Sequence, residues 1–177
     1  MILLTAAFIG LALTGCNDSD GGGKTTTPAG GVQAAAGNTG QNSGDDKYTF
    51  TYEGIDIVLG AEAGPIVKAL GEPKHVFEDP SCAFEGIDKM YYYDGFIVNT
   101  YPDGDKDYVL SVVFSDDSVK TDKGIYLGMT LEDITKAYGD GYENDLGLYT
   151  YTLGLTELSF IIEDGKIADI KYYYNVL

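Results

Sequence analysis

His75 and Cys82 are the residues of this sequence best suited to act as a base and a nucleophile, and both lie between a predicted helix and the next predicted strand. A thiolate can attack an acyl carbon when an imidazole activates it and a third group orients that imidazole. No orienting residue and no glycine-rich nucleophile turn accompanies this pair. With one histidine and two cysteines, the chain also lacks the ligands of a zinc site. We therefore expect no catalytic residue, no bound metal and no cofactor.

An acidic run, Asp103-Gly104-Asp105-Lys106-Asp107, matches the start of a calcium-binding loop. The sixth position of such a loop should be Gly but is Tyr108, and the twelfth should be Glu but is Phe114. We therefore interpret this run as the solvated tip of a hairpin.

Tyrosines are the strongest candidates for recognition, because the chain has 15 of them and no tryptophan. Side chains alternate across a strand, so consecutive tyrosines such as 91–93 and 172–174 cannot all face a core. We expect some to form an open sheet face that binds another protein. The alternative is that these rings pair across strands and only stabilise the sheet. The candidate binding residues are Tyr101, Tyr173, Tyr91, Tyr93, Tyr149 and Tyr151.

The pattern of the predicted strand 167–174 indicates which side chains are exposed. Ile170 and Tyr172 share one face, while Asp169, Lys171 and Tyr173 share the other. The charged set should face water, which exposes Tyr173. The same reasoning pairs Asn99 with Tyr101 in strand 96–101 and predicts that Tyr101 is exposed. Both faces of the strands that carry the other four candidates are mixed, so their orientation stays open.

The charge of the chain excludes one class of partner. Its formal net charge is −17, and it contains lysine but no arginine. Nucleic acids are bound through basic patches that displace counterions from phosphates, so we expect no nucleic-acid binding. Acidity of this degree also argues against adsorption to anionic lipid.

The N-terminus carries an apolar run from Ile2 to Leu13 that ends in Leu13-Thr14-Gly15-Cys16. This segment resembles the signal peptide and lipobox of bacterial lipoproteins. The resemblance implies that Cys16 receives a diacylglyceryl group and anchors the chain at the extracytoplasmic face of the cell membrane. Residues 1–4 lack the Lys or Arg usual at the start of such peptides, which leaves open whether the natural start lies upstream.

Composition then divides the chain into three parts. Residues 1–16 are the predicted signal peptide, and residues 17–46, rich in Gly, Thr, Ser, Asn and Ala, are a predicted flexible tether. Residues 47–177 hold nearly all aromatic and β-branched residues and form the predicted domain. If Cys16 carries lipid, Cys82 has no intramolecular partner, and we expect it to be buried as a small apolar side chain.

Two segments of the domain match at a fixed offset without a gap. Each predicts a strand end, a turn and a short helix closed by glycine, Gly71 in one copy and Gly139 in the other, with positive φ in the left-handed helical region. Thr130-Leu131-Glu132-Asp133 predicts a capping box with Thr130 as N-cap. The matching residues are Ile57, Leu59, Gly60, Ile66, Lys68, Ala69 and Gly71 in the first copy, and Ile125, Leu127, Gly128, Ile134, Lys136, Ala137 and Gly139 in the second.

Strands follow each predicted helix, and Asp94-Gly95 and Asp164-Gly165 predict hairpin turns. We therefore expect an α+β fold of two tandem lobes, each a short helix followed by an antiparallel meander, with repeat 1 at about 47–120 and repeat 2 at about 121–177. The predicted strands are 48–52, 88–93, 96–101, 108–114, 148–153, 156–163 and 167–174.

The segments from Leu59-Gly60 to Gly71-Glu72-Pro73 and from Leu127-Gly128-Met129-Thr130 to Gly139 resemble a known repeat. It is shared by the β-lactamase-inhibitory protein family and the small outer-membrane assembly lipoproteins, in a Gly-Met-Thr-like helix start and a Leu-Gly-x-Pro-like helix end. The resemblance implies that the sheets of both lobes form one curved surface. The inhibitor family's binding loops cannot be placed on this sequence, so no inhibitory residue is carried over.

These patterns predict a lipid-anchored, exported, non-enzymatic module that binds a protein through a tyrosine-rich sheet face. Two alternatives stay open: a structural factor in envelope assembly, and an inhibitor of a secreted hydrolase such as a β-lactamase. The expected contacts are the membrane, through lipid on Cys16, and one unidentified protein.

Overall fold

The computed structural model describes residues 47–176, so the predicted signal peptide, the predicted tether and Cys16 lie outside the described residues. Strands make up 49% and helices 12% of the described part. Neither helix there is long and apolar enough to cross a membrane. The elements in chain order are β1 (Thr49–Tyr52), β2 (Ile55–Val58), α1 (Ala63–Leu70), β3 (His75–Pro80), β4 (Ile87–Tyr92), β5 (Phe96–Asp103), β6 (Lys106–Phe114), α2 (Leu131–Tyr138), β7 (Glu143–Asp145), β8 (Leu148–Leu153), β9 (Thr156–Glu163) and β10 (Lys166–Tyr174).

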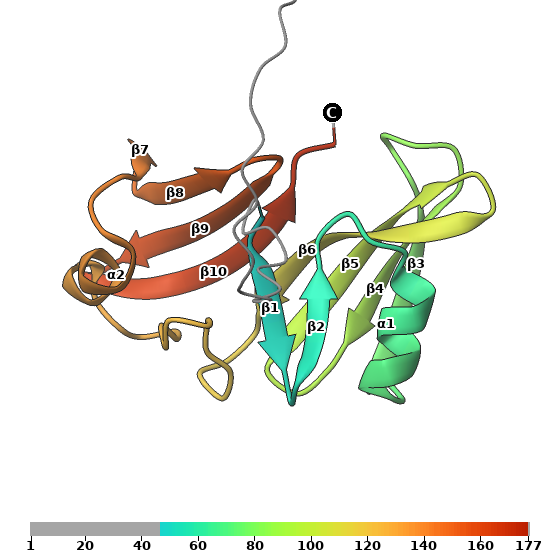
Figure 1. The fold of residues 1–177 in the computed structure, drawn as a ribbon, viewed down its shortest axis with the longest axis horizontal. Coiled ribbons are helices and arrows are strands. Elements are labelled where there is room, and N and C mark those ends of the chain that lie inside the picture. Colours follow the sequence, from blue (N-terminus) through green and yellow to red (C-terminus); the bar gives the residue numbers. More distant parts are fainter. Residues whose placement is uncertain (1–46, 177) are drawn as a thin grey trace, which may run out of the picture. The chain divides into compact units, whose positions relative to one another are not determined.

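Eight strands form one antiparallel sheet in the order β3-β4-β5-β6-β10-β9-β8-β7, and β1 pairs with β2 in a separate hairpin (Figure 1). At the centre, β6 pairs with β10, with Val112 opposite Tyr172. The predicted α+β fold of two tandem helix-plus-meander lobes is therefore wrong: the protein is mostly β, and its main feature is one eight-stranded antiparallel sheet. The reason is that the last strand of each meander satisfies its backbone hydrogen bonds on the other one.

The sequence predicts the hairpin-forming strands better than the strands at the sheet edges. The bounds of β8 and β9 are those expected, and Asp164 and Gly165 between β9 and β10 have φ of 50° and 76°, as a type I′ turn requires. The edge strands β3 and β7 were not predicted. Every residue of both is exposed, so neither shows the alternation of a half-buried strand, and each exists through its pairing with β4 or β8.

The start of α2 is as predicted, and the ends of both helices are as predicted in part. The capping box of α2 is confirmed: the backbone N–H of Asp133 donates to Thr130 Oγ1, and the backbone N–H of Thr130 donates to Asp133 Oδ2 at 2.9 Å. Gly71 and Gly139 follow the helices with φ of 84° and 85°. Their ψ angles of −162° and −170° are extended, so the positive φ is confirmed but the left-handed helical ψ is wrong. This backbone region is open to glycine almost alone.

The two copies of the sequence motif attach to the sheet in the same way. The carbonyl of Val109 in β6 accepts a hydrogen bond from the backbone N–H of Gly60 at 2.8 Å, and the N–H of Val109 donates to the carbonyl of Ala61 at 2.9 Å. In the same way, the carbonyl of Ile167 in β10 accepts from the N–H of Gly128 at 2.8 Å, and the N–H of Ile167 donates to the carbonyl of Met129 at 2.8 Å. The turn before each helix thus occupies the edge of β6 or β10 beyond the short stretch in which these strands pair with each other.

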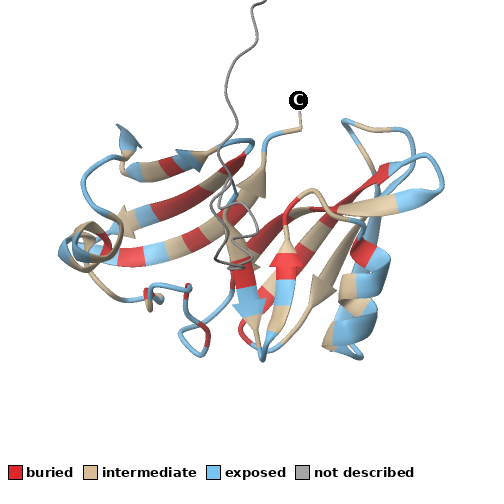
Figure 2. Cartoon of the chain, viewed as in Figure 1, coloured by how far each residue is buried: buried red, intermediate tan, exposed pale blue. Residues whose placement is uncertain are grey.

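The core lies on one face of the sheet, which α1, α2 and the β1–β2 hairpin cover (Figure 2). Phe50 of the hairpin packs on three rings of the central strands, with centroid distances of 5.2 Å to Phe96, 5.0 Å to Phe114 and 5.9 Å to Tyr172. Buried and half-buried residues alternate along much of β5 and β10, so the opposite face carries a second set of side chains.

Candidate functional site

The strand β10 carries one set of side chains into the core and the other to the opposite face. Ile170 and Tyr172 are fully buried, whereas Asp169, Lys171 and Tyr173 are partly exposed. This is the orientation that the sequence predicts. Tyr173 therefore lies on the face that the helices leave free.

A groove of about 340 Å³ runs over β8, β9 and β10 on that face. We call it the β8–β10 groove. Hydrogen-bonded pairing places its residues side by side: Leu148 lies opposite Ile161, and Ile161 lies opposite Asp169. Its lining combines apolar, hydroxyl and charged groups: Leu148, Thr150, Glu157, Ser159, Ile161, Asp169, Lys171 and Tyr173.

The charged groups of the groove are not paired with each other. Lys171 Nζ lies 4.5 Å from the centroid of the Tyr173 ring, which is a cation–π arrangement. Burial raises the pKa of Asp169, and the positive charge of Lys171 lowers it by a smaller amount. Within the described residues, no hydrogen bond or ion pair reaches the Asp169 carboxylate. The groove therefore offers a partly desolvated acid beside apolar side chains.

Tyr101, the second tyrosine predicted to be exposed, is buried instead. Its ring lies 4.8 Å from Phe84 and 5.8 Å from Tyr108, measured between centroids. Phe84 belongs to the loop between β3 and β4, and this loop covers the ring that strand alternation alone would expose. The prediction that Tyr101 is exposed is wrong for this reason.

Tyr91, Tyr93, Tyr149 and Tyr151 lie on the covered face and pack against the core. Tyr151 is buried, donates a hydrogen bond to Gly139 O at 2.6 Å, and burial raises its pKa to about 12. Tyr91, Tyr93 and Tyr149 are half-buried. These packing contacts favour the alternative in which the four rings stabilise the sheet, and their binding role stays a prediction.

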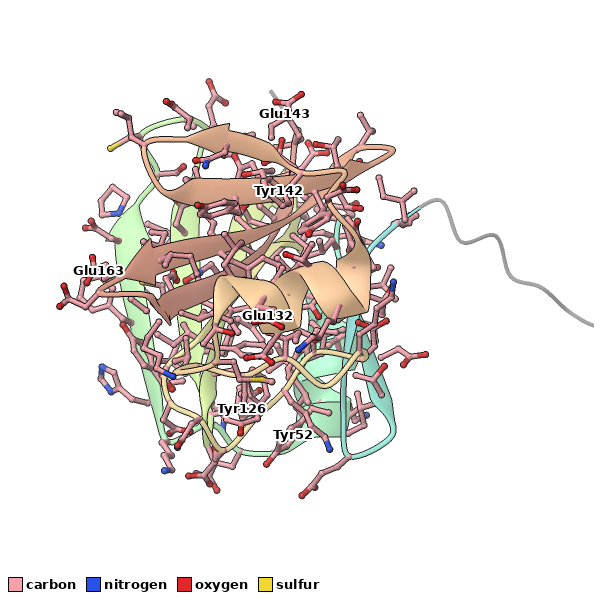
Figure 3. The ribbon with its side chains drawn as sticks, turned by 90° about the vertical axis from the view of Figure 1, so that its left-hand side faces the viewer. Tyr52, Tyr126, Glu132, Tyr142, Glu143 and Glu163 are labelled. Atoms are coloured by element: carbon pink, nitrogen blue, oxygen red, sulfur yellow. The ribbon has the colours of Figure 1, made fainter. Side chains whose placement is uncertain are left out.

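A cluster of tyrosines joins α2 to the outer strands of the sheet. Tyr142 packs edge-on against Tyr149, with centroids 4.9 Å apart, and Tyr138 lies 5.5 Å from Tyr151. In Figure 3, Glu132 is labelled on α2, and Tyr142 is labelled over the outer strands, above that helix in this view. The hydroxyl of Tyr138 donates to Asp122 at 3.0 Å, and burial raises the pKa of Tyr138 well above its usual range. The rings of this cluster are thus used for packing.

The remaining candidates for chemistry stay separate. His75 begins β3, and Cys82 follows the end of that strand, so the length of the strand, roughly 17 Å at 3.3 Å per residue, separates them. Cys82 is exposed, which corrects the expectation of burial, because it lies in the surface loop between β3 and β4. Among residues 47–176, no group of three or more His, Cys, Asp or Glu side chains could hold a metal ion.

The acidic run at 103–107 is a hairpin tip, as predicted, because β5 ends at Asp103 and β6 begins at Lys106. Its last residue is not simply solvated. Asp107 accepts a hydrogen bond from Lys89 Nζ at 2.6 Å, and this bond raises the pKa of Lys89.

Sequence reasoning missed the apolar side of the groove. Leu148 and Ile161 are exposed, at 40% and 38%. In the sequence, both look like apolar strand residues that could equally well face the core. The available signal was strand alternation in β8. Because Tyr149 and Tyr151 face the core, Leu148 and Thr150 must lie on the opposite face, which is that of Tyr173.

Comparison with known proteins adds little to this geometry. No family model and no curated protein matches the sequence. The chain is similar to the solved structure of a DUF4309 family protein, YjgB, from Bacillus subtilis subsp. subtilis str. 168. That match has 18% identity and a TM-score of 0.41, and covers 67% of this chain and 82% of that chain.

A second similar structure is an extracellular protein containing an SCP domain from Bacillus anthracis str. Ames. It is 12% identical, with a TM-score of 0.43, and the match covers 71% of this chain and 48% of that one. This chain thus spans about half the length of that protein. The resemblance to the β-lactamase-inhibitory proteins and the assembly lipoproteins stays a prediction.

Proposed function

We propose that this chain is an exported, lipid-anchored, non-enzymatic module that binds a protein partner through the β8–β10 groove. The observation that carries the proposal is the composition of this groove on the face opposite the helices. Leu148 and Ile161 expose apolar surface there beside Asp169, in the same groove as Lys171 and Tyr173.

Such a combination suits a protein interface. Aromatic and apolar side chains supply most of the binding free energy at the centre of an interface, and polar groups around them set the orientation of the partner. Tyr173 is already held by Lys171, so its ring loses little conformational freedom on binding. The groove replaces the wider tyrosine-rich face expected from the sequence, because most of the tyrosines pack in the core.

Site-specific photo-cross-linking tests this proposal. The photoreactive residue p-benzoylphenylalanine replaces Tyr173 in the full chain in its native membrane. The matched control replaces Tyr126, which is 41% exposed and lies outside the groove. We expect a discrete adduct from position 173 and none from position 126.

The absence of an adduct at position 173, or equal adducts at both positions, would contradict the proposal. The identity of the captured protein also separates the two alternatives. A component of envelope assembly would favour the structural role, and a secreted hydrolase would favour inhibition.

The lipid anchor rests on the sequence and has its own test. Mass spectrometry of the mature N-terminus should show an acyl mass on Cys16, and Cys16→Ser should release the chain from membranes or leave it unprocessed. A mature chain that begins elsewhere, or that carries no acyl mass, would refute the anchor without affecting the groove.

A further inference from the structure

The β8–β10 groove contains a carboxylate, that of Asp169, with which no described cation forms an ion pair. Asp169 is partly buried on β10, and the neighbouring cation on the same face, Lys171, lies over the Tyr173 ring without forming an ion pair with Asp169. Glu157 adds a second carboxylate to the lining. Burial of an acid without a partner is unfavourable, and an approaching cation would relieve it.

The surroundings of Asp169 are apolar on one side. A cross-strand row places Leu148, Ile161 and Asp169 next to one another on β8, β9 and β10. Two residues before Leu148, the turn between β7 and β8 carries Leu146, which is fully exposed and has φ of 49°. Leucine rarely adopts positive φ, so the turn presents this side chain to solvent at an energetic cost.

We propose that the occupant of the groove is a basic, partly apolar protein segment, whose Lys or Arg reaches Asp169 while a neighbouring large apolar side chain packs on Leu148 and Ile161. This inference rests on the proposed function and adds the chemistry of the partner. The charge of the chain supports it, because a net charge of −17 attracts basic segments and repels acidic ones.

A small cation would not account for the same features. Asp169 pairs with Ile161, whereas Glu157 pairs with Tyr173 four positions further along the strands. A cation at Asp169 would therefore meet a single carboxylate beside leucine and isoleucine, which offers too few oxygen ligands for calcium or magnesium. The exposed apolar side chains would also stay uncovered by such an ion, whereas a peptide segment covers them and pairs with the acid.

The test uses the full chain, purified in detergent micelles, and three labelled synthetic peptides. The peptide Leu-Lys-Leu-Lys-Leu is the probe, and its controls replace Lys by Glu or Leu by Ser. Fluorescence anisotropy measures binding to the wild type, to Asp169→Asn and to Glu72→Gln. Glu72 is an exposed acid that follows α1, so Glu72→Gln removes the same charge outside the groove.

We expect only the Leu-Lys peptide to bind, with an affinity that falls about tenfold in Asp169→Asn and less than twofold in Glu72→Gln. In spectra of labelled isoleucine methyl groups, the peptide should shift Ile161 and leave Ile87 unchanged, although their exposures of 38% and 40% are nearly equal.

Equal losses in the two variants would show attraction to net charge only and would overturn the inference. Binding of the Glu or Ser peptide as tight as that of the Leu-Lys peptide would also overturn it, as would no binding of any peptide. None of these results would affect the cross-linking experiment at position 173, so that experiment tests the proposed function separately.

Discussion

At the residue scale, contacts with neighbouring side chains decide whether a tyrosine that strand alternation predicts to be exposed is exposed or buried. Tyr173 lies beside Lys171 in the β8–β10 groove, while Phe84 from a distant loop buries Tyr101. Both residues occupy the same kind of position in their strands. The difference between them is therefore a matter of packing and should appear as a difference in stability.

We predict that Tyr101→Ala lowers the free energy of unfolding by about 3 kcal/mol, because it removes a buried ring and leaves a cavity against Phe84 and Tyr108. Tyr173→Ala should lower it by less than about 1 kcal/mol, since that ring is partly exposed. Urea denaturation measures both. Similar losses for the two variants would show that the two rings are equally buried.

We also predict that Asp169→Asn raises the melting temperature at pH 7. Burial raises the pKa of Asp169 above its ordinary value of 3.8, so the folded state holds the proton more tightly than the unfolded state. The stabilising effect of this protonation is present below about pH 3.8 and is lost as the pH rises through the folded pKa. The amide stays neutral throughout, so its advantage should disappear in acid. Thermal melts between pH 3 and pH 7 measure it.

Asp133→Asn is the control with the opposite sign. Hydrogen bonds from Thr130 lower the pKa of Asp133, so its contribution to stability is present at neutral pH and is lost as the pH falls through the folded pKa. This variant should melt lower than the wild type at pH 7. If both variants changed the melting temperature in the same direction, the two pKa directions could not both be right.

At the element scale, short local signals define both helices. A proline lies in the first turn of α1, a capping box begins α2, and a glycine with positive φ follows each helix. These features act through the backbone of a few adjacent residues, which is why they can be read from the sequence. Gly71 and Gly139 reach the same conformation in two different places of the sheet.

Gly71→Ala and Gly139→Ala should each lower the free energy of unfolding by about 1–3 kcal/mol. An added Cβ meets no atom within 4 Å at either position, so the loss would come from backbone strain alone. Gly64→Ala is the matched control, because Gly64 lies within α1 and also has free space around its Cβ. It should stabilise the protein by about 0.5–1 kcal/mol. Losses at all three positions would point to an effect other than positive φ.

At the scale of the whole molecule, one sheet and one core connect the two copies of the motif. The strands β6 and β10 pair over only a short stretch, from Ser111 to Val113 on β6. Phe50 adds to this junction, because its ring touches Phe114 on β6 and Tyr172 on β10. The hairpin β1–β2 thus stabilises both halves of the sheet together.

We therefore predict a single cooperative unfolding transition for residues 47–177, and a loss of about 4 kcal/mol in Phe50→Ala without a change in that cooperativity. Urea denaturation followed by far-ultraviolet circular dichroism and by tyrosine fluorescence should give coincident curves. Two separated transitions would mean that the halves fold independently and would contradict this prediction.

The sequence alone determined the local features of this protein. It predicted the bounds of β8 and β9, the Asp164-Gly165 turn, the capping box at Thr130 and the faces of β10, because each depends on residues close together in the chain. It also predicts lipid on Cys16, which stays a prediction. These features follow from backbone preferences and the period of side chains along one strand.

Tertiary structure decided the rest. The pairing of β6 with β10, the covering of Tyr101 by Phe84, and the existence of the edge strands β3 and β7 all depend on contacts with another segment. The β8–β10 groove likewise forms only when three strands align Leu148, Ile161 and Asp169 in one row. No local pattern encodes such alignments, because their free energy comes from burying surfaces that meet only in the folded chain.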